Sequence, residues 1–142
     1  MTDLAYRATV RIEAPVADTE VTDRVRAAIT NVFPDADVEE RPGLLVAETH
    51  SLSTFSEGLH RQEILDTARG VFFDTREGDR FSFSLKKGAA FEGVVNFAVD
   101  DDDELGTVDV TVQVDEPDVE TLIDHVAPPT EDGRPVDAGD GP

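Results

Sequence analysis

The sequence has no cysteine, no tryptophan, only two lysines and no long apolar run. Without cysteine, the chain has no disulfide framework, no thiolate nucleophile and no cysteine zinc site. A membrane-spanning helix needs about 18 consecutive apolar residues, and the N-terminal residues show no signal-peptide pattern. We therefore expect a soluble cytoplasmic protein, whose 142 residues form a core without covalent cross-links.

Acidic residues dominate the charge that is present. Asp and Glu number 32 against 12 Lys and Arg, so the formal net charge at pH 7 is −20. The apolar residues are regularly spaced, which indicates a folded domain rather than a disordered chain. Strong acidity on a folded domain is typical of proteins that work in molar salt, where the Debye length falls to about 3 Å. We interpret the chain as a haloarchaeal protein whose acidic residues mainly serve this adaptation.

Half of the positive charge lies between residues 59 and 97. This stretch holds six basic and six acidic residues, so it is neutral, whereas the segments on either side carry the whole net charge. The basic residues are Arg61, Arg69, Arg76, Arg80, Lys86 and Lys87. In so acidic a chain, a neutral region predicts a surface kept for a polyanion or a protein partner.

The apolar pattern predicts an α+β fold, a mostly antiparallel sheet with helices on one face. Alternation with a period of two predicts strands, and helical spacing predicts helices. The expected strands cover 4–12, 38–40, 44–49, 81–85, 94–99 and 108–114, and the expected helices cover 21–33, 54–72 (one kinked helix or two short ones) and 117–126. Gly88 to Gly93 is expected to be a tight hairpin turn. We expect residues 1–126 to form a single domain and residues 127–142 to form an acidic disordered tail.

Signatures of catalysis and of cofactor binding are absent. There is no Gly-x-Ser-x-Gly, no phosphate-binding loop and no dinucleotide fingerprint. His60 and Glu63 share a helix face, but a metal site needs a third ligand. Asp100 to Glu104 lacks the glycine and the ligand alternation of a calcium loop. The sequence therefore predicts no catalytic residue, no metal and no cofactor, and a small hydrolase or isomerase using Asp66, His60 and Glu63 remains a lesser alternative.

A basic set offers the strongest candidate binding site. Arg61 and Arg69 are eight residues apart, which is about two helical turns, so they can project from one helix face. Lys86 and Lys87 lie where a strand enters a turn, and Asn96 lies on the next strand. Arginine pairs with phosphate through two hydrogen bonds or stacks on a base, and lysine supplies a point charge. The alternative is that these side chains form solvated faces and internal ion pairs.

Asp66 precedes Arg69 by three residues on the same expected helix. At this spacing the carboxylate and the guanidinium can pair across one turn. We expect Asp66 to be a structural partner that orients Arg69, not a general acid or base, because no second poised group accompanies it.

Two sequence elements resemble an uncharacterised archaeal protein family that is predicted to bind RNA. They are Ile64-Leu-Asp-x-Ala-Arg69 and Ala89-Ala-Phe-x-Gly…Asn96-Phe97, and Glu104-Leu-Gly106 follows them. The resemblance covers about residues 4–126. It implies a fold similar to the L-five type of large-subunit ribosomal protein. It also implies RNA or a ribonucleoprotein, such as an exosome-type complex, as the partner.

The resemblance and the charge together define the expected binding. The matching positions include Arg61, Arg69, Lys87 and Asn96, whereas Glu63 replaces a basic residue of the family pattern. Molar salt removes most of the affinity that comes from counterion release. We therefore expect a non-catalytic protein that binds RNA weakly, with shallow salt dependence, through hydrogen bonds, stacking and shape. A protein–protein adaptor that uses the same neutral face without nucleic acid is the alternative.

Overall fold

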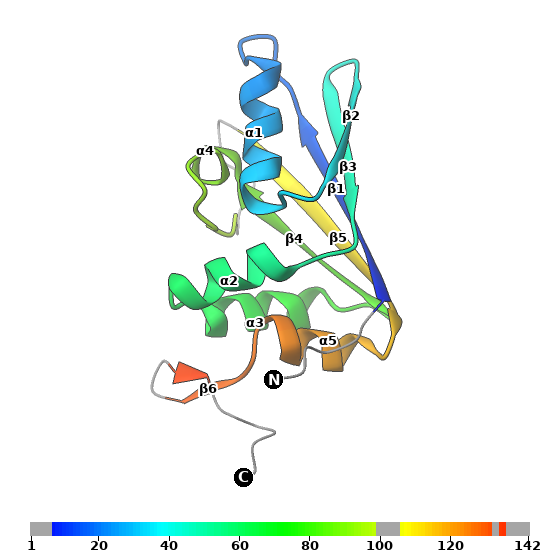
Figure 1. Ribbon diagram of the computed structural model, residues 1–142, viewed down its shortest axis with the longest axis vertical. Coiled ribbons are helices and arrows are strands. Elements are labelled where there is room, and N and C mark those ends of the chain that lie inside the picture. The colour runs from blue at the N-terminus through cyan, green and yellow to red at the C-terminus, as the bar shows by residue number, and fades with distance from the viewer. Residues whose placement is uncertain (1–6, 99–105, 132–133, 136–142) are drawn as a thin grey trace.

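A computed structural model describes residues 7–98, 106–131 and 134–135 of the chain (Figure 1). Elements of the main domain follow one another in the order β1 (Arg7–Pro15), α1 (Thr22–Val32), β2 (Asp37–Arg41), β3 (Leu44–Thr49), α2 (Ser53–Arg61), α3 (Leu65–Thr75), β4 (Arg80–Lys86), α4 (Lys87–Phe91), β5 (Thr107–Glu116) and α5 (Val119–Val126). Two short strands, β6 (Thr130–Glu131) and β7 (Arg134–Pro135), pair with each other after α5.

A five-stranded sheet with the order β2-β3-β1-β5-β4 forms one layer, and every neighbouring pair is antiparallel. In β1 the side chains alternate between buried and more exposed, as the period of two predicts. Val10 pairs with Val112 of β5 and with Thr49 of β3, which places apolar side chains of the central strands on the same face. The helices cover that face (Figure 1). The predicted α+β class is confirmed.

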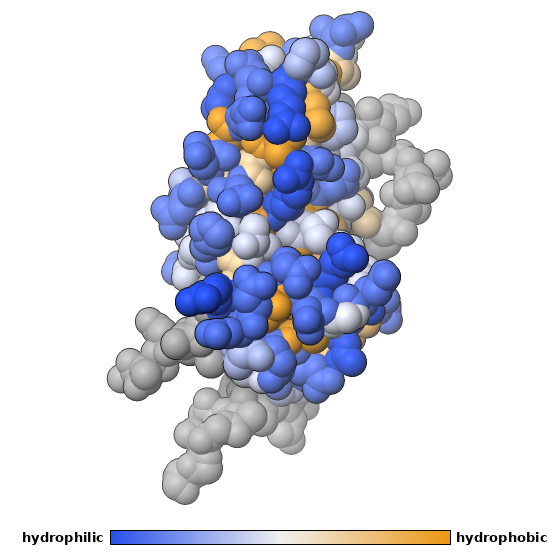
Figure 2. Space-filling view, turned by 90° about the vertical axis from the view of Figure 1, so that its right-hand side faces the viewer, coloured by the Kyte–Doolittle hydropathy of each residue, from blue (hydrophilic) through white to orange (hydrophobic). Residues whose placement is uncertain are grey.

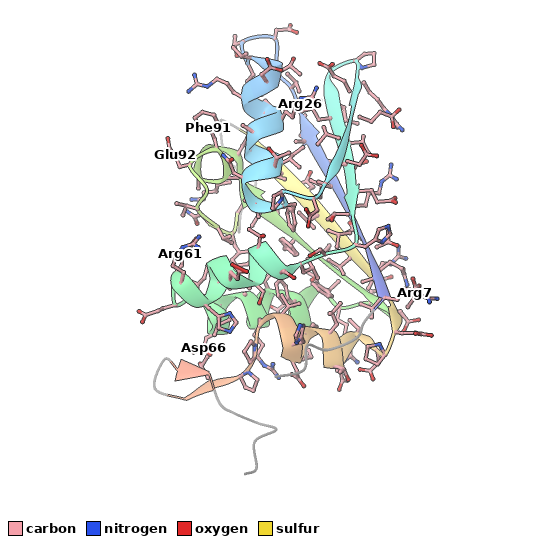
Figure 3. The ribbon with its side chains drawn as sticks, viewed as in Figure 1. Arg7, Arg26, Arg61, Asp66, Phe91 and Glu92 are labelled. Carbon is pink, nitrogen blue, oxygen red and sulfur yellow. The ribbon has the colours of Figure 1, made fainter. Side chains whose placement is uncertain are left out.

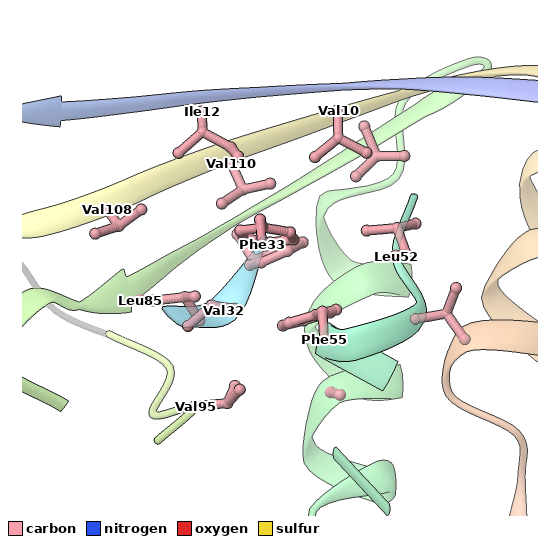
Figure 4. Close-up of a cluster of buried hydrophobic side chains, with 14 of the residues drawn as sticks. Val10, Ile12, Val32, Phe33, Leu52, Phe55, Leu85, Val95, Val108 and Val110 are labelled. Atoms are coloured by element: carbon pink, nitrogen blue, oxygen red, sulfur yellow. The ribbon is translucent and has the colours of Figure 1, made fainter. Parts of the chain in front are cut away.

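Phenylalanine side chains fill the core between the sheet and the helices. Phe55 of α2 stacks on Phe83 of β4 with ring centroids 5.0 Å apart, and Phe33 stacks on Phe55 at 5.5 Å. Phe72 of α3 lies 4.7 Å from Phe81. Figure 4 shows Phe33, Leu52 and Phe55 facing Val10 and other strand residues. Aromatic rings bury large apolar areas, so this cluster fixes how the helical layer packs on the sheet.

The segment expected to be one kinked helix or two short ones forms two helices, α2 and α3. The chain turns between them at Glu63, whose φ of 58° is left-handed. This turn accounts for the break in helical spacing between Leu59 and Ile64, because Leu59 belongs to α2 and Ile64 directly precedes α3. The Leu59 side chain is buried and the Ile64 side chain is partly buried.

Two local predictions around β4 were wrong. The segment Gly88 to Gly93 is not a plain hairpin turn, because its first part forms the short helix α4, which ends before Gly93 with a φ of +77°. Of the expected strand at 94–99, the structure describes residues 94–98, and these form one isolated bridge, between Phe97 and Leu85. It still lies along the free edge of β4, since Lys86 N–H donates to Asn96 O and Ala98 N–H donates to Ser84 O.

Ordered contacts continue beyond α5. Ala127 is fully buried, and the hydroxyl of Thr130 donates to Asp66 on α3. Most of the segment 132–142 lies outside the described residues, as does the acidic segment Asp100 to Glu104, so the predicted tail stays a prediction there. None of the helices in the described part of the chain is long and apolar enough to cross a membrane.

Candidate nucleic-acid interface

Lys87 points into the protein, not toward solvent. Its exposed fraction is 5%, and its Nζ donates to Pro15 O at 2.7 Å and to the two carboxylate oxygens of Glu20 at 2.9 and 3.2 Å. Gly106 gives this lysine its space, because a Cβ at that position would lie 3.2 Å from Nζ. Lys87 therefore connects α4 to the loop before α1, and its buried ammonium group is not available to bind a phosphate.

Glu20 is the acidic partner in this ion pair. Burial by itself raises the pKa of its carboxyl group, but the N–H of Ala17 and the Lys87 ammonium donate hydrogen bonds to it. These bonds outweigh the burial and hold the pKa of Glu20 below its ordinary value of 4.5. Glu20 is therefore ionised at neutral pH.

Arg69 is also held by its own molecule. Its Nη1 lies 2.7 Å from Asp124 of α5 and donates to Ala127 O at 3.2 Å, and its guanidinium lies over the Phe73 ring. Asp66, the partner predicted for Arg69, accepts a hydrogen bond from Thr130 instead. The reason is tertiary, since α5 packs beside α3 and brings a better-placed carboxylate than the one a turn away. Asp66 has a structural partner, but not the predicted one.

Arg61, Lys86 and Asn96 remain at the surface, on segments that hydrogen bonds hold together. Arg61 ends α2, and the next residue, Gln62, donates its Nε2 to Val95 O at 2.8 Å and accepts the Val95 N–H at 2.9 Å. Asn96 follows Val95, and its carbonyl accepts the Lys86 N–H. Among the described residues, none forms an ion pair with Arg61 or Lys86. The role of Gln62 was not predicted from the sequence, where its position next to Arg61 is the only signal for it.

The other cations of the neutral stretch do not join this group. Arg76 pairs with Glu120 at 2.5 Å, and Arg80 lies at the opposite end of β4 from Lys86. Figure 3 shows Arg61 at one side of the molecule and Arg7 at the other.

The side of Figure 1 that bears β2 and β3 is mostly hydrophilic, with apolar residues visible only between polar ones (Figure 2). The structure therefore brings three of the five candidate residues to neighbouring surface segments and takes Lys87 and Arg69 into internal contacts.

The residues of the alternative catalytic set face different surroundings. The His60 ring contacts Ser56 O within its own helix, and Asp66 bonds to Thr130. No group of three potential metal-ligating side chains occurs within the part of the chain that the structure describes. This arrangement offers no poised acid–base pair with a shared target.

The likeness to known proteins agrees with the motifs. A protein-family model described as RNA binding matches residues 9–114. A UPF0201 protein from Metallosphaera sedula is 37% identical over 131 residues, which cover 88% of this chain and 91% of that protein. This chain belongs to the archaeal UPF0201 family.

Solved UPF0201 structures share the fold described above. The crystal structure of a UPF0201 protein from Methanococcus jannaschii superimposes with a TM-score of 0.82 at 33% identity, covering 91% of this chain and 99% of that one. The match covers almost the whole of the Methanococcus jannaschii chain, so the sheet and its helical layer together form the UPF0201 fold.

One UPF0201 relative is much longer. The UPF0200/UPF0201 protein of Archaeoglobus fulgidus is 36% identical over 134 residues, which cover 94% of this chain but only 41% of that protein. This chain therefore spans less than half the length of that relative, which bears the names of two families.

Proposed function

We propose that this protein is a non-catalytic RNA- or ribonucleoprotein-binding protein, and that Arg61, Lys86 and Asn96 contact the RNA. The observation that carries the proposal is the family described as RNA binding, combined with two surface cations that no described acidic side chain neutralises. These residues occupy the edge where α2, the end of β4 and the segment 94–97 meet. They belong to the stretch 59–97, which has no net charge in a chain of net charge −20.

The chemistry of the three side chains suits a single-stranded or irregular RNA. Arg61 offers a planar guanidinium for phosphate or for stacking, Lys86 offers a point charge, and the Asn96 amide can both donate and accept hydrogen bonds. Only two cations act on the backbone, so the electrostatic contribution is small. The salt slope of binding is then shallow, at about 0.7 per phosphate contact on a single strand.

The first prediction concerns the double substitution of Arg61→Gln with Lys86→Gln. We expect RNA affinity to fall at least about fivefold at 0.2 M KCl, and the slope of log K against log salt to decrease by about 1.4, because two phosphate contacts are lost. Fluorescence anisotropy with labelled RNA fragments between 0.1 and 2 M KCl measures both quantities.

Arg41→Gln is the matched control for this measurement. Arg41 is an exposed arginine at the end of β2, where it pairs with Glu39 at 3.4 Å, and it lies outside the proposed interface. The control should bind RNA like the unmodified protein. Equal losses in both variants would show a nonspecific charge effect, and absence of RNA binding by the unmodified protein would reject the proposal.

A protein–protein adaptor is the second candidate, and the long Archaeoglobus fulgidus relative favours it. There a part similar to this chain is joined to a further part, which is how two proteins that act together are sometimes encoded. In this case the same edge would contact a protein. Capture from cell lysate that survives ribonuclease and is lost in the Arg61/Lys86 double variant would favour the adaptor. Capture that ribonuclease abolishes would favour RNA.

A further inference from the structure

A cavity of about 320 Å³ lies between the start of α1 and α4, and of the residues described above it includes the ion pair of Lys87 and Glu20. Its volume is at the lower end of the range for ligand pockets, which runs from about 300 to 1,000 Å³. Its lining includes Glu20, Val21, Arg24, Lys87 and Phe91. Most of the surface that this lining exposes is apolar, and Val21 keeps 59% of its surface exposed.

A flat stacking surface forms one part of the cavity. The guanidinium of Arg24 lies over the Phe91 ring at 4.6 Å from its centroid. Phe91 is held in place because Asn31 of α1 donates its Nδ2 to Phe91 O at 2.7 Å. Aromatic rings and arginine planes are the surfaces on which proteins stack unpaired nucleic-acid bases.

A hydrogen-bond acceptor forms the polar part of the cavity. The Glu20 carboxylate has about four acceptor positions, and the bonds from Ala17 and Lys87 occupy three of them. Its side chain keeps 21% of its surface exposed and lines the cavity. The remaining position, on Oε2, can accept one N–H of a ligand. The ion pair to Lys87 fixes this oxygen, so little side-chain entropy is lost on binding.

The charge of the cavity suits an anionic polymer. Lys87 and Glu20 neutralise each other in the lining, so Arg24 alone makes it net positive, in a chain of net charge −20. A larger hollow of about 920 Å³ beside β2 and β3 has the opposite character, since Asp35, Asp37, Glu39 and Glu48 outnumber its arginines. A polyanion is repelled there and not at the cavity beside α4.

The geometry points to an unpaired purine base of the bound RNA as the occupant of this cavity. The base stacks on the pair that Arg24 and Phe91 form, not between their planes, which lie too close to admit a ring, and its exocyclic amino group donates to Glu20. The inference rests on the proposed RNA-binding function and adds to it a specific base site. Figure 3 shows Phe91 and Arg61 along the same side of the molecule, so one strand can reach both.

The experiment compares three single-stranded RNA octamers with the unmodified protein. One is all uridine, the second has one central adenosine, and the third has purine riboside, which lacks the amino group, at the same position. We expect the adenosine octamer to bind at least about fivefold more tightly than the uridine octamer, because one purine stacks and donates. The purine riboside octamer should fall between them. Equal affinity of all three octamers would overturn the inference.

Phe91→Leu supplies the protein side of this test, and Phe73→Leu is its matched control. Phe73 is also a phenylalanine under an arginine, since Arg69 lies 5.0 Å from its ring centroid, and 37% of its surface is exposed. It does not line the cavity. We expect Phe91→Leu to remove the preference for adenosine and Phe73→Leu to keep it.

The outcomes separate this inference from the proposed function. If the Arg61/Lys86 double variant weakens binding but neither Phe91→Leu nor base identity changes it, the base site is rejected and RNA binding stands. If the unmodified protein binds none of the octamers and no RNA fragment, both proposals fail. Thermal unfolding of each variant verifies that the fold is retained.

Discussion

Lys86 and Lys87 are adjacent in the chain, yet they have opposite environments. Lys86 ends β4 with its side chain exposed, whereas Lys87 begins α4 with its ammonium buried against Glu20 and Pro15 O. A buried ammonium is stable only when it is paired and fully hydrogen-bonded, and here three acceptors surround it. The function of Lys87 is therefore structural, and through Glu20 it also shapes the proposed base site.

Lys87→Met tests this role at the scale of one residue. We expect the free energy of unfolding at pH 7 to fall by about 3 kcal/mol, because the substitution leaves the Glu20 carboxylate without its partner. Lys86→Met, the adjacent exposed lysine, should change it by less than about 0.5 kcal/mol. Chemical denaturation followed by circular dichroism measures both. A Lys87→Met variant as stable as Lys86→Met would contradict the structural role.

The same pair gives a pH dependence with a defined sign. The pKa of Glu20 is lower in the folded protein than its ordinary 4.5, so its contribution to stability is present above about pH 4.5 and is lost as pH falls through the folded pKa. The stability difference between the unmodified protein and Lys87→Met should therefore narrow below about pH 4.5. A difference that widens on acidification would contradict this assignment.

At the scale of elements, Gln62 joins two parts of the candidate interface. Its amide both donates to and accepts from the backbone of Val95, which fastens the segment 94–97 to the end of α2. Val95 itself is buried, so its backbone groups have little access to water. This contact brings the segment that contains Arg61 next to the segment that contains Asn96, although 35 residues separate the two in the sequence.

Gln62→Ala should loosen this contact without unfolding the domain. Two backbone groups of Val95 lose their partner, and we expect a cost of about 2 kcal/mol in the free energy of unfolding. The amide hydrogen of Val95 should exchange faster with solvent, as measured by hydrogen exchange. Gln62→Glu is the matched control, since a carboxylate still accepts from Val95 N–H and should retain part of the protection. Unchanged exchange in Gln62→Ala would show that other contacts hold the segment.

At the scale of the whole molecule, the net charge of −20 opposes folding at low salt. The described ion pairs are mostly exposed, for example Arg11 with Glu13 at 3.8 Å, and exposed pairs contribute little. Screening by salt is therefore the main relief for the acidic surface. The haloarchaeal origin inferred from the composition leads to a direct prediction.

We expect the thermal unfolding midpoint to rise steadily between 0.1 and 2 M KCl, as the Debye length falls from about 10 Å to below 3 Å. A variant with Glu57→Gln and Asp74→Asn, two exposed acids, should show a smaller rise because it starts with less repulsion. Thermal unfolding followed by circular dichroism measures both curves. A midpoint that is independent of salt would contradict the halophilic interpretation.

The sequence by itself determined the α+β class, the strands and the paired helices, because hydrophobic periodicity acts locally and each element must bury its apolar face. The same local rules failed at 88–99, where two glycines and alternating residues suit both a hairpin and the observed α4 with its edge segment. Only the tertiary structure decided which cations are available. Lys87 pairs with Glu20, which is 67 residues away in the sequence, and Arg69 pairs with Asp124, which is 55 residues away. Ion pairs form between side chains that folding brings together, and no local pattern in the chain records such distances.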